Sequence, residues 1–592
     1  MFGFRSRIGL LLFAFTLPAS AALTNQLKNH PSPYLAQHGA DPVAWQEWNT
    51  DTVARARREN KLLFVSVGYF ACHWCHVMQR ESYNNPQIAA RLNRDFIPVK
   101  VDRELNSGLD EALQQFSSRL NGVAGWPLNA LVTPEGYPAF VVLYAPAAEF
   151  GSLIDRLSAR WRADDRSIRQ LARSAAPPPA LKPVAEAVNG ARAEKAMAGF
   201  LASVWQEADL LHGGFGTVSK FPMAPQLDTL LARQASNPDP RLAEFLRLSF
   251  DQIAARGLRD HVGGGFFRYT VDPGWETPHF EKMLYDNAHL AGLYGRAASV
   301  LRQPRYRDIA RSTLDFMRDT LADASGGFYT STSAVDASGR EGASYLWEPE
   351  ELQRHLSPET YAAVRRVWRL DAPRNFEAGY LPAENRPPTQ AERQLLDEAV
   401  RVLRPLRRAR SLPVDNKLNA GLNGLALSAF SRSLALDPGY RKTADRLQDF
   451  LLKRMVQGGR LVKSRARGQV FPDAELEDYA YVVQGLVDHA DATGNAESRA
   501  QAIRLARVAW RDFWNERGWL REARPLLATV APEPALADGA LYSPSAVLIG
   551  ASLRLGDAEL SQRARASLAW RIPAMAADPY MFPTQTRLLA QP

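Results

Sequence analysis

The 592-residue chain has two cysteines, and both lie in one short string, Cys72-His73-Trp74-Cys75-His76. Two cysteines three positions apart indicate local chemistry rather than a framework of disulfides spread along the chain. A cysteine at the start of a helix meets free backbone N–H groups and the positive end of the helix dipole, which favours the thiolate. Cys72 could then attack a disulfide, and Cys75, one turn further on, could resolve the mixed disulfide. The string predicts a redox dithiol with Cys72 and Cys75 as its catalytic residues.

Two other chemistries use the same residue types. Cys-x-x-Cys-His is also the attachment string of c-type haem, with His76 as its histidine. A zinc site would combine both cysteines with His73 and His76, although neighbours this close rarely enclose one ion tetrahedrally, and the chain offers no second Cys/His pair. The pattern around the string favours the dithiol over both alternatives, and we expect no metal and no other cofactor.

The elements around the string are those of an α/β sheet. Residues 62–67 form a short, nearly continuous apolar run typical of a strand buried on both faces, and the cysteine string follows after a short loop. From Val77 onward the pattern is helical. Strands separated by helices predict an α/β domain over 23–175. The further strands are expected at 96–101, 128–132 and 139–144. One helix is expected before the first strand, at 51–60, and another between the second and third strands, at 110–120.

Trp126 and Pro127 lead directly into the third expected strand. A proline just before a central strand is compatible with a cis peptide bond held beside the dithiol. In thioredoxin-like folds that element contacts the backbone of the bound substrate. We therefore expect the redox site to be supported by His73, Trp74, His76, Trp126 and Pro127.

A proline-rich stretch, 176–189, reads as a linker, and the pattern beyond it is helix after helix to residue 592. Gly-Gly-Phe recurs at 213–215, 264–266 and 326–328, each time between helices, which suggests a repeated helical hairpin with a short β excursion. About a dozen helices in such pairs predict an (α/α)6 toroid over 190–592, with an open solenoid as the alternative. The expected helices are 191–209, 240–257, 284–301, 306–321, 421–436, 440–455, 478–492, 496–514 and 543–555.

A dense polar and aromatic cluster marks a candidate pocket in the helical part. His279, Glu281 and Asp286 could supply acid and base groups, and aromatic rings could stack on a sugar. His279 and Asp286 share a face only if the stretch is helical, and Pro278 suggests that a helix begins there. A purely structural role is the other interpretation, in which His279 and Glu281 cap that helix and Arg268 pairs with Asp272. The candidate residues are Arg268, Tyr269, Asp272, Trp275, His279, Glu281, Tyr285, Asp286 and, more weakly, Asp478.

Composition and the first residues bear on partners and compartment. The net charge of +9 comes largely from arginines in helical stretches without interleaved aromatic residues, so we expect a solvated surface and no nucleic-acid partner. Residues 1–22 combine Arg5 and Arg7, an apolar stretch and an Ala19-Ser20-Ala21 cleavage signature. We expect a signal peptide and a periplasmic or secreted protein, with an uncleaved anchor or a buried N-terminal helix as the alternative. No later segment has the length and apolarity of a membrane span.

Several strings together resemble the family of the mammalian spermatogenesis-associated thioredoxin-domain protein and its bacterial relatives. That resemblance implies a thioredoxin-like domain followed by an α/α toroid similar to those of sugar 2-epimerases and some glycosidases. The strings that carry it are 32–38, 41–45, 72–78 with Glu81-Ser82, 101–104, 125–129, 220–222, 263–266, 278–286 and 477–480.

The chain departs from the expected patterns at three places. Ordinary thioredoxins have a buried aspartate six residues before the first cysteine, where this chain has Ser66 and so lacks that base. Thr332 and Ser333 stand where the family is expected to have an acidic pair, and Leu422 stands where a tryptophan is expected. The last two departures make sugar epimerase or hydrolase activity the less favoured expectation.

We therefore expect a thiol–disulfide oxidoreductase that acts on a thiol- or disulfide-bearing protein client, with a toroid that binds the client or a carbohydrate ligand. The alternative is a carbohydrate-active or carbohydrate-binding toroid in which the thioredoxin-like domain is structural or regulatory. A scaffold without either activity is the third hypothesis.

Overall fold

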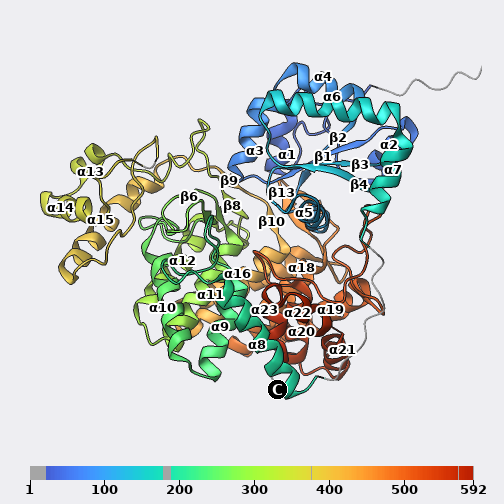
Figure 1. Cartoon of the computed structure of the whole chain (residues 1–592). Helices are drawn as coiled ribbons and strands as arrows, with labels where there is room; N and C mark the ends of the chain where they lie inside the picture. The colour runs from blue at the N-terminus through green and yellow to red at the C-terminus, as the bar shows by residue number, and fades with distance from the viewer. Residues whose placement is uncertain (1–21, 178–187, 375, 571, 591–592) are drawn as a thin grey trace, which may run out of the picture.

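The computed structural model describes residues 22–177, 188–374, 376–570 and 572–590 (Figure 1). Residues 1–21 of the expected signal peptide and residues 178–187 of the expected linker lie outside the described residues. A small α/β domain at the N-terminal end sits on one end of a larger helical domain. The α/β domain's last helix, α7 (Asp165–Ser174), is followed in the helical domain by α8 (Gly190–Glu207).

The α/β domain is built on a four-stranded sheet in the order β2-β1-β3-β4. The first two strands run parallel, with Leu63 opposite Ile97, and are joined through helices; the last two strands are antiparallel. A parallel βαβ unit followed by an antiparallel hairpin is the sheet of a thioredoxin-like domain, as expected. The strands are β1 (Leu63–Gly68), β2 (Ile97–Asp102), β3 (Leu128–Val132) and β4 (Pro138–Val142).

Alternate residues of β1 belong to two separate hydrophobic cores, one on each face of the sheet. Phe64 lies on the face of the sheet that is covered by α3, α4 and α6. Val65 lies on the opposite face, which is covered by α2 and α5. Both faces are covered, so all six residues of β1 are buried, as the continuous apolar run predicts. The helices are α2 (Thr50–Glu59), α3 (His73–Met78), α4 (Pro86–Asp95), α5 (Ser107–Asn121) and α6 (Ala147–Ala163).

The helical domain is a closed ring in the part of the chain that the structure describes. Each inner helix contacts the next, and the last one returns to the first, so the ring is a toroid and not an open solenoid. The inner helices are buried on most sides, whereas the outer ones bury one face with three- and four-residue spacing. The inner helices are α9 (Ala224–Ser236), α11 (Leu284–Val300), α16 (Ala420–Arg432), α18 (Leu476–Thr493), α20 (Pro544–Arg554) and α23 (Pro583–Leu589).

The outer helices alternate with the inner ones along the sequence, which completes the predicted hairpins. They are α8, α10 (Pro240–Ala255), α12 (Arg305–Phe316), α17 (Arg441–Phe450), α19 (Ala496–Phe513) and α21 (Ala558–Ala569). A further group of helices, α13 (Pro349–His355), α14 (Pro358–Val367) and α15 (Gln390–Arg408), projects from the ring between α12 and α16 (Figure 1).

Each of the three Gly-Gly-Phe strings forms a turn after an outer helix, and the third turn is one residue shorter than the first two. Each phenylalanine makes an isolated β bridge to a residue just before the turn: Phe215 to Ala208, Phe266 to Arg259, and Phe328 to Ala322. The expected β excursion is therefore present at all three positions.

One expectation about local structure is wrong. Pro278 does not begin a helix: Pro278–His279 is the short strand β6, paired with β5 (Tyr269–Thr270), and α11 begins at Leu284. The local propensity of proline for a first helical turn is overridden by this antiparallel pairing. Among the described residues no helix is long and apolar enough to cross a membrane.

Candidate functional site

The two cysteines lie at the start of α3, directly after the loop that follows β1. Cys72 is the N-cap residue, and its sulfur accepts a hydrogen bond from the backbone N–H of Cys75 at 3.1 Å. The two sulfurs are joined as a disulfide, with the Cα atoms 5.3 Å apart. The side chains of both are almost completely buried, Cys72 being 2% and Cys75 1% exposed. The site therefore has the helix-start geometry of a redox dithiol, but it does not lie open on the surface.

The expected supporting residues surround this helix. Trp74 is the exposed one, at 39%, and packs against Tyr144 with ring centroids 4.9 Å apart. His76 turns inward and contacts the Phe70 carbonyl oxygen through Nε2 at 2.9 Å. Burial lowers the pKa of His76 to about 4, so this histidine is neutral at pH 7. The peptide bond between Trp126 and Pro127, at the start of β3, is cis.

His73 reaches across to the toroid. Its Nδ1 lies 3.3 Å from Glu341 Oε2, while Glu341 Oε1 lies 2.5 Å from Nδ1 of His279. The two imidazoles stack, with ring centroids 5.3 Å apart and planes 21° apart. Burial lowers the pKa of His73, whereas the hydrogen bond with Glu341 raises that of His279 against the effect of burial. One carboxylate is thus hydrogen-bonded to a residue of the predicted toroid pocket and lies beside the residue between the cysteines, whose Nδ1 has no hydrogen bond within the described part of the chain.

A second contact joins the same two regions deeper in the interface. Tyr69, three residues before Cys72, donates a hydrogen bond to Glu281 Oε2 at 2.6 Å. The Arg268 guanidinium donates to Tyr69, pairs with Glu281 at 3.4 Å and lies 4.9 Å from the centre of the Trp126 ring. All of these groups except Trp126 are buried. Residues predicted separately for the redox site and for the toroid pocket thus contact one another between the domains.

The bottom of this site holds polar atoms without partners. Tyr285 and Asp286 lie in the first turn of α11, and Tyr285 Oη and Asp286 Oδ2 have no hydrogen-bond partner among the described residues. Burial raises the pKa of Asp286 to about 8, although the charge of Arg268 opposes the shift. Asp286 is therefore largely protonated at pH 7 and can donate a hydrogen bond.

The structural alternative for the toroid cluster is also wrong in detail. Arg268 pairs with Glu281 and not with Asp272, and the N-cap position of α11 is Met283, so neither His279 nor Glu281 caps it. The strand pairing of 278–279 turns these side chains toward the α/β domain instead.

The remaining candidate residues of the toroid make structural contacts. Asp272 accepts backbone hydrogen bonds within its own turn, and Trp275 is buried with its indole N–H donating to His212 O at 3.0 Å. The rings of Tyr269 and His279 pack together with their centroids 5.1 Å apart. Asp478 lies in the first turn of α18, 3.1 Å from the buried amine of Lys463.

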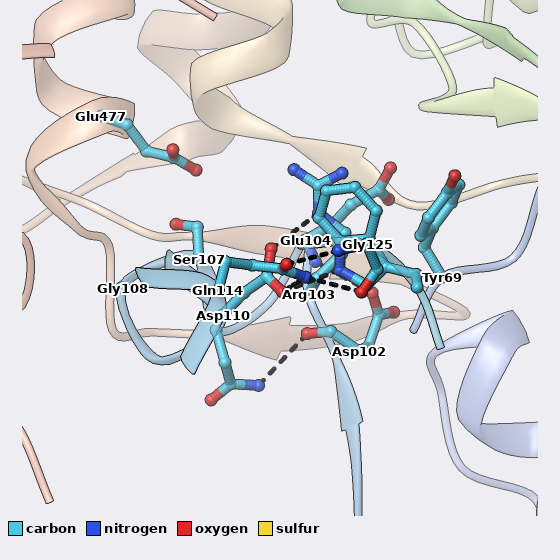
Figure 2. Close-up of polar contacts among 12 residues, drawn as sticks. Tyr69, Asp102, Arg103, Glu104, Ser107, Gly108, Asp110, Gln114, Gly125 and Glu477 are labelled. Atoms are coloured by element: carbon cyan, nitrogen blue, oxygen red, sulfur yellow. Dashed lines mark hydrogen bonds and ion pairs between the residues drawn. The ribbon is translucent and has the colours of Figure 1, made fainter. Parts of the chain in front are cut away.

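Two buried lysines of the toroid fasten the domains together. Lys417 Nζ lies 2.9 Å from Asp102 Oδ2 and 3.1 Å from Glu104 Oε2, both at the end of β2. Lys463 binds Ser107 Oγ at 2.9 Å at the start of α5. Figure 2 shows this region, with Arg103 among the polar contacts of the α/β domain and Glu477 approaching from the toroid. Removal of either lysine would leave buried carboxylates without their counter-charge.

Some residues of the site were not named in the sequence analysis, and the sequence pointed to some of them more clearly than to others. Asp102 and Glu104 lie in a string that carries the family resemblance, and Tyr69 precedes the cysteines closely. Glu341 lies in a loop far from both histidines in sequence, and nothing around it indicates its role. Among the described residues, no group of three or more His, Cys, Asp or Glu side chains could hold a metal ion.

Comparisons with known proteins agree with this architecture. The family model named Thioredox_DsbH, described as a protein of unknown function (DUF255), matches residues 24–177. Spermatogenesis-associated protein 20 of Rattus norvegicus is 31% identical over 571 residues, covering 85% of this chain and 71% of the relative. The Homo sapiens protein of that name is 31% identical over 563 residues, covering 83% and 70%.

Solved structures with a similar arrangement are far more distant in sequence. The GH76 α-mannanase BT2949 of Bacteroides thetaiotaomicron is 10% identical, with a TM-score of 0.38 over 64% of this chain and 81% of that one. Cellobiose 2-epimerase of Spirochaeta thermophila is 17% identical, with a TM-score of 0.30 over 61% and 96%. The toroid assignment rests on the ring of helix contacts in this chain.

Fold and site together define a class of protein in which a thioredoxin-like domain is docked, disulfide inward, on one end of an α/α toroid. The chain belongs to the spermatogenesis-associated protein 20 family.

Proposed function

We propose that the chain catalyses thiol–disulfide exchange. In the reducing direction, the Cys72 thiolate attacks a sulfur of a client disulfide, and one client sulfur leaves as a thiolate that takes a proton from solvent. Cys75 then loses its proton and attacks Cys72, which forms the internal disulfide and releases the second client thiolate. The client disulfide gains the two electrons that the dithiol loses. The observation that carries the proposal is the N–H donation from Cys75 to Cys72 Sγ, since the same contact stabilises a thiolate.

The buried position of the dithiol limits how a client can reach it. The exposed ring of Trp74 and the partly exposed His73 and Glu341 form the rim nearest the cysteines. We propose that a client segment binds along Trp74 and displaces the Glu341 bridge before exchange. Thiol- or disulfide-bearing proteins that present a narrow, extended segment fit this entry better than folded surfaces do.

The second candidate function uses the toroid end of the same site. Asp286, Tyr285 and Glu281 converge there, and a protonated, unpartnered carboxyl is suited to binding a hydroxyl of a carbohydrate. The α/β domain covers this end through Tyr69, so a sugar would have to enter between the domains. Binding of a carbohydrate would then be coupled to the position of the thioredoxin-like domain.

The decisive test is insulin reduction and refolding of a scrambled disulfide substrate by the wild type and by Cys72→Ala. Thiol–disulfide exchange predicts activity in the wild type and a rate at the uncatalysed background in the variant. Equal rates for the two proteins would reject the proposal. A glycan array with wild type and Asp286→Ala tests the second candidate, and no signal above background for the wild type would reject it. If both tests fail, the remaining hypothesis is a scaffold without either activity.

The compartment is a separate proposal. We infer from residues 1–22 that the protein is exported to the periplasm or secreted, where disulfide chemistry can operate. N-terminal sequencing of protein recovered from the periplasmic fraction of a bacterial host should find that these residues have been removed. A full-length chain confined to the cytoplasm would contradict this.

A further inference from the structure

A row of three polar side chains crosses the buried sheet on the face that carries α3. Ser66 of β1 stands opposite Lys100 of β2 on one side and Asn129 of β3 on the other. All three are at most 1% exposed. Ser66 is the position where the sequence departs from ordinary thioredoxins, so the structure shows what occupies the place of their buried acid: a lysine hydrogen-bonded to a serine.

Lys100 is buried without a carboxylate within ion-pair distance among the described residues. Its amine donates to Ser66 Oγ at 3.0 Å and faces three aromatic rings, those of Tyr83 at 4.6 Å and of Tyr34 and Trp45 at 5.3 Å. Burial lowers the pKa of Lys100 to about 7, although the charge of Asp41 opposes the shift. The amine therefore gains and loses its proton near neutral pH, where thiol–disulfide exchange takes place.

Tyr34 connects this amine to the dithiol. Its hydroxyl is buried and has no hydrogen-bond partner among the described residues. A Cβ placed on Gly68 would lie 2.2 Å from Tyr34 Oη and 2.8 Å from Cys75 Sγ, so the hydroxyl and the sulfur flank the same point. The Lys100 amine lies over the ring of the same tyrosine, 5.3 Å from its centroid.

The other titratable groups around Lys100 do not change charge near neutral pH. Burial lowers the pKa values of His38 and His76 to about 4, so both are neutral. Burial opposes ionisation of Asp41, but its hydrogen bonds with His38 and other donors lower its pKa, so it stays charged. Burial raises the pKa values of the Tyr34 and Tyr83 hydroxyls, which keep their protons. Lys100 is the group of this set that titrates.

Resting on the proposed thiol–disulfide exchange, we propose that Lys100 is a positioning residue that sets the protonation of Cys75 through Tyr34, in the role that a buried carboxylic acid has elsewhere. When Cys75 resolves a mixed disulfide, its thiol loses its proton to solvent that reaches the site with the client. The Tyr34 hydroxyl, which keeps its own proton and has no other partner among the described residues, donates a hydrogen bond to the Cys75 thiolate. The protonated amine of Lys100 beside the Tyr34 ring stabilises the same thiolate by its charge until the Cys72–Cys75 bond forms and the client thiolate leaves.

The test is the difference in absorbance at 240 nm between the reduced and oxidised full-length protein from pH 5 to 9. Tyrosine ionisation cancels in this difference, and the chain has only the two cysteines, so the signal reports their thiolates. The variants are Lys100→Met, Lys100→Arg and Tyr34→Phe, with the exposed Lys453→Met as the matched control. Tyr34→Phe removes a hydroxyl that has no partner and so does not depend on Lys100→Met being able to fold.

Loss of the nearby charge in Lys100→Met should raise the midpoint of thiolate formation by about one pH unit or more. Lys100→Arg should keep a low midpoint but lose the inflection near pH 7, and Tyr34→Phe should raise the midpoint as well. Titrations of Lys100→Met and Tyr34→Phe that match the wild type would overturn the inference; if Lys100→Met does not fold, Tyr34→Phe alone decides. Shifted titrations in a protein that reduces no insulin would support the role of Lys100 and reject the proposed function instead.

Discussion

His73, which lies between the two cysteines, stacks on His279 of the toroid with ring centroids 5.3 Å apart, and Glu341 is hydrogen-bonded to His279 and lies 3.3 Å from His73 Nδ1. This relationship places the dithiol of one domain against the candidate pocket of the other. Access to the disulfide is consequently a property of both domains, and the contacts between them are the place to test it.

Replacing the bridging carboxylate should open the site. In Glu341→Gln the two histidines lose a charged partner, so reduction of the Cys72–Cys75 disulfide by dithiothreitol should become several-fold faster. The rate of thiol appearance measures this. The exposed Glu350→Gln on α13 is the matched control and should react like the wild type. Unchanged rates in Glu341→Gln would mean that the bridge does not limit access.

Removing a buried lysine should loosen the domain interface. The Lys417 side chain is fully buried beside Asp102 and Glu104, so Lys417→Met leaves buried carboxylates without a counter-charge and should cost about 3–5 kcal/mol of stability. Chemical denaturation measures the loss, and maleimide labelling of the reduced protein should become faster as well.

The control for this prediction is a lysine with an exposed partner. Lys453 pairs with Asp449 on the surface, and Lys453→Met should cost at most about 1 kcal/mol. Equal losses for the two variants would show that the interface cluster contributes no more than a surface pair.

The buried Asp286 should make stability fall as pH rises. Burial raises its pKa from 3.8 to about 8, so between these values the folded state holds a proton that the unfolded state has lost. The amide that replaces the carboxyl in the Asp286→Asn variant does not titrate, so the folding stability of the variant relative to the wild type should rise across this window. The gain should be on the order of a few kcal/mol at pH 8.5. Thermal midpoints at pH 4, 6 and 8.5 measure the difference; the exposed Asp308→Asn should run parallel to the wild type, and parallel curves for Asp286→Asn would contradict the prediction.

The two cysteines should be unequal in exchange. Cys72 begins α3 and Cys75 follows one turn later, so Cys75→Ala should accumulate a mixed disulfide with its client, whereas Cys72→Ala should form none. Non-reducing electrophoresis after incubation with a disulfide peptide shows the adduct by its mass. Adducts on Cys72→Ala alone would reverse the assigned roles.

The sequence by itself determined the local elements and the type of fold. The apolar run of β1 and the helix start at Cys72 could be predicted because both depend on neighbouring residues. The Gly-Gly-Phe turns could be predicted for the same reason, since each repeats within one helical hairpin. The family strings extended this to the toroid, because they span most of the chain.

Only the tertiary structure decided that the two candidate sites are one. The pairing of His73 with His279 through Glu341, and of Ser66 with Lys100, joins residues that local periodicity does not connect. Pro278 shows the same limit, since its strand pairing depends on β5 and overrides its preference for a helix start. Long-range burial and charge pairing are set by how the domains pack, and that packing encloses the dithiol.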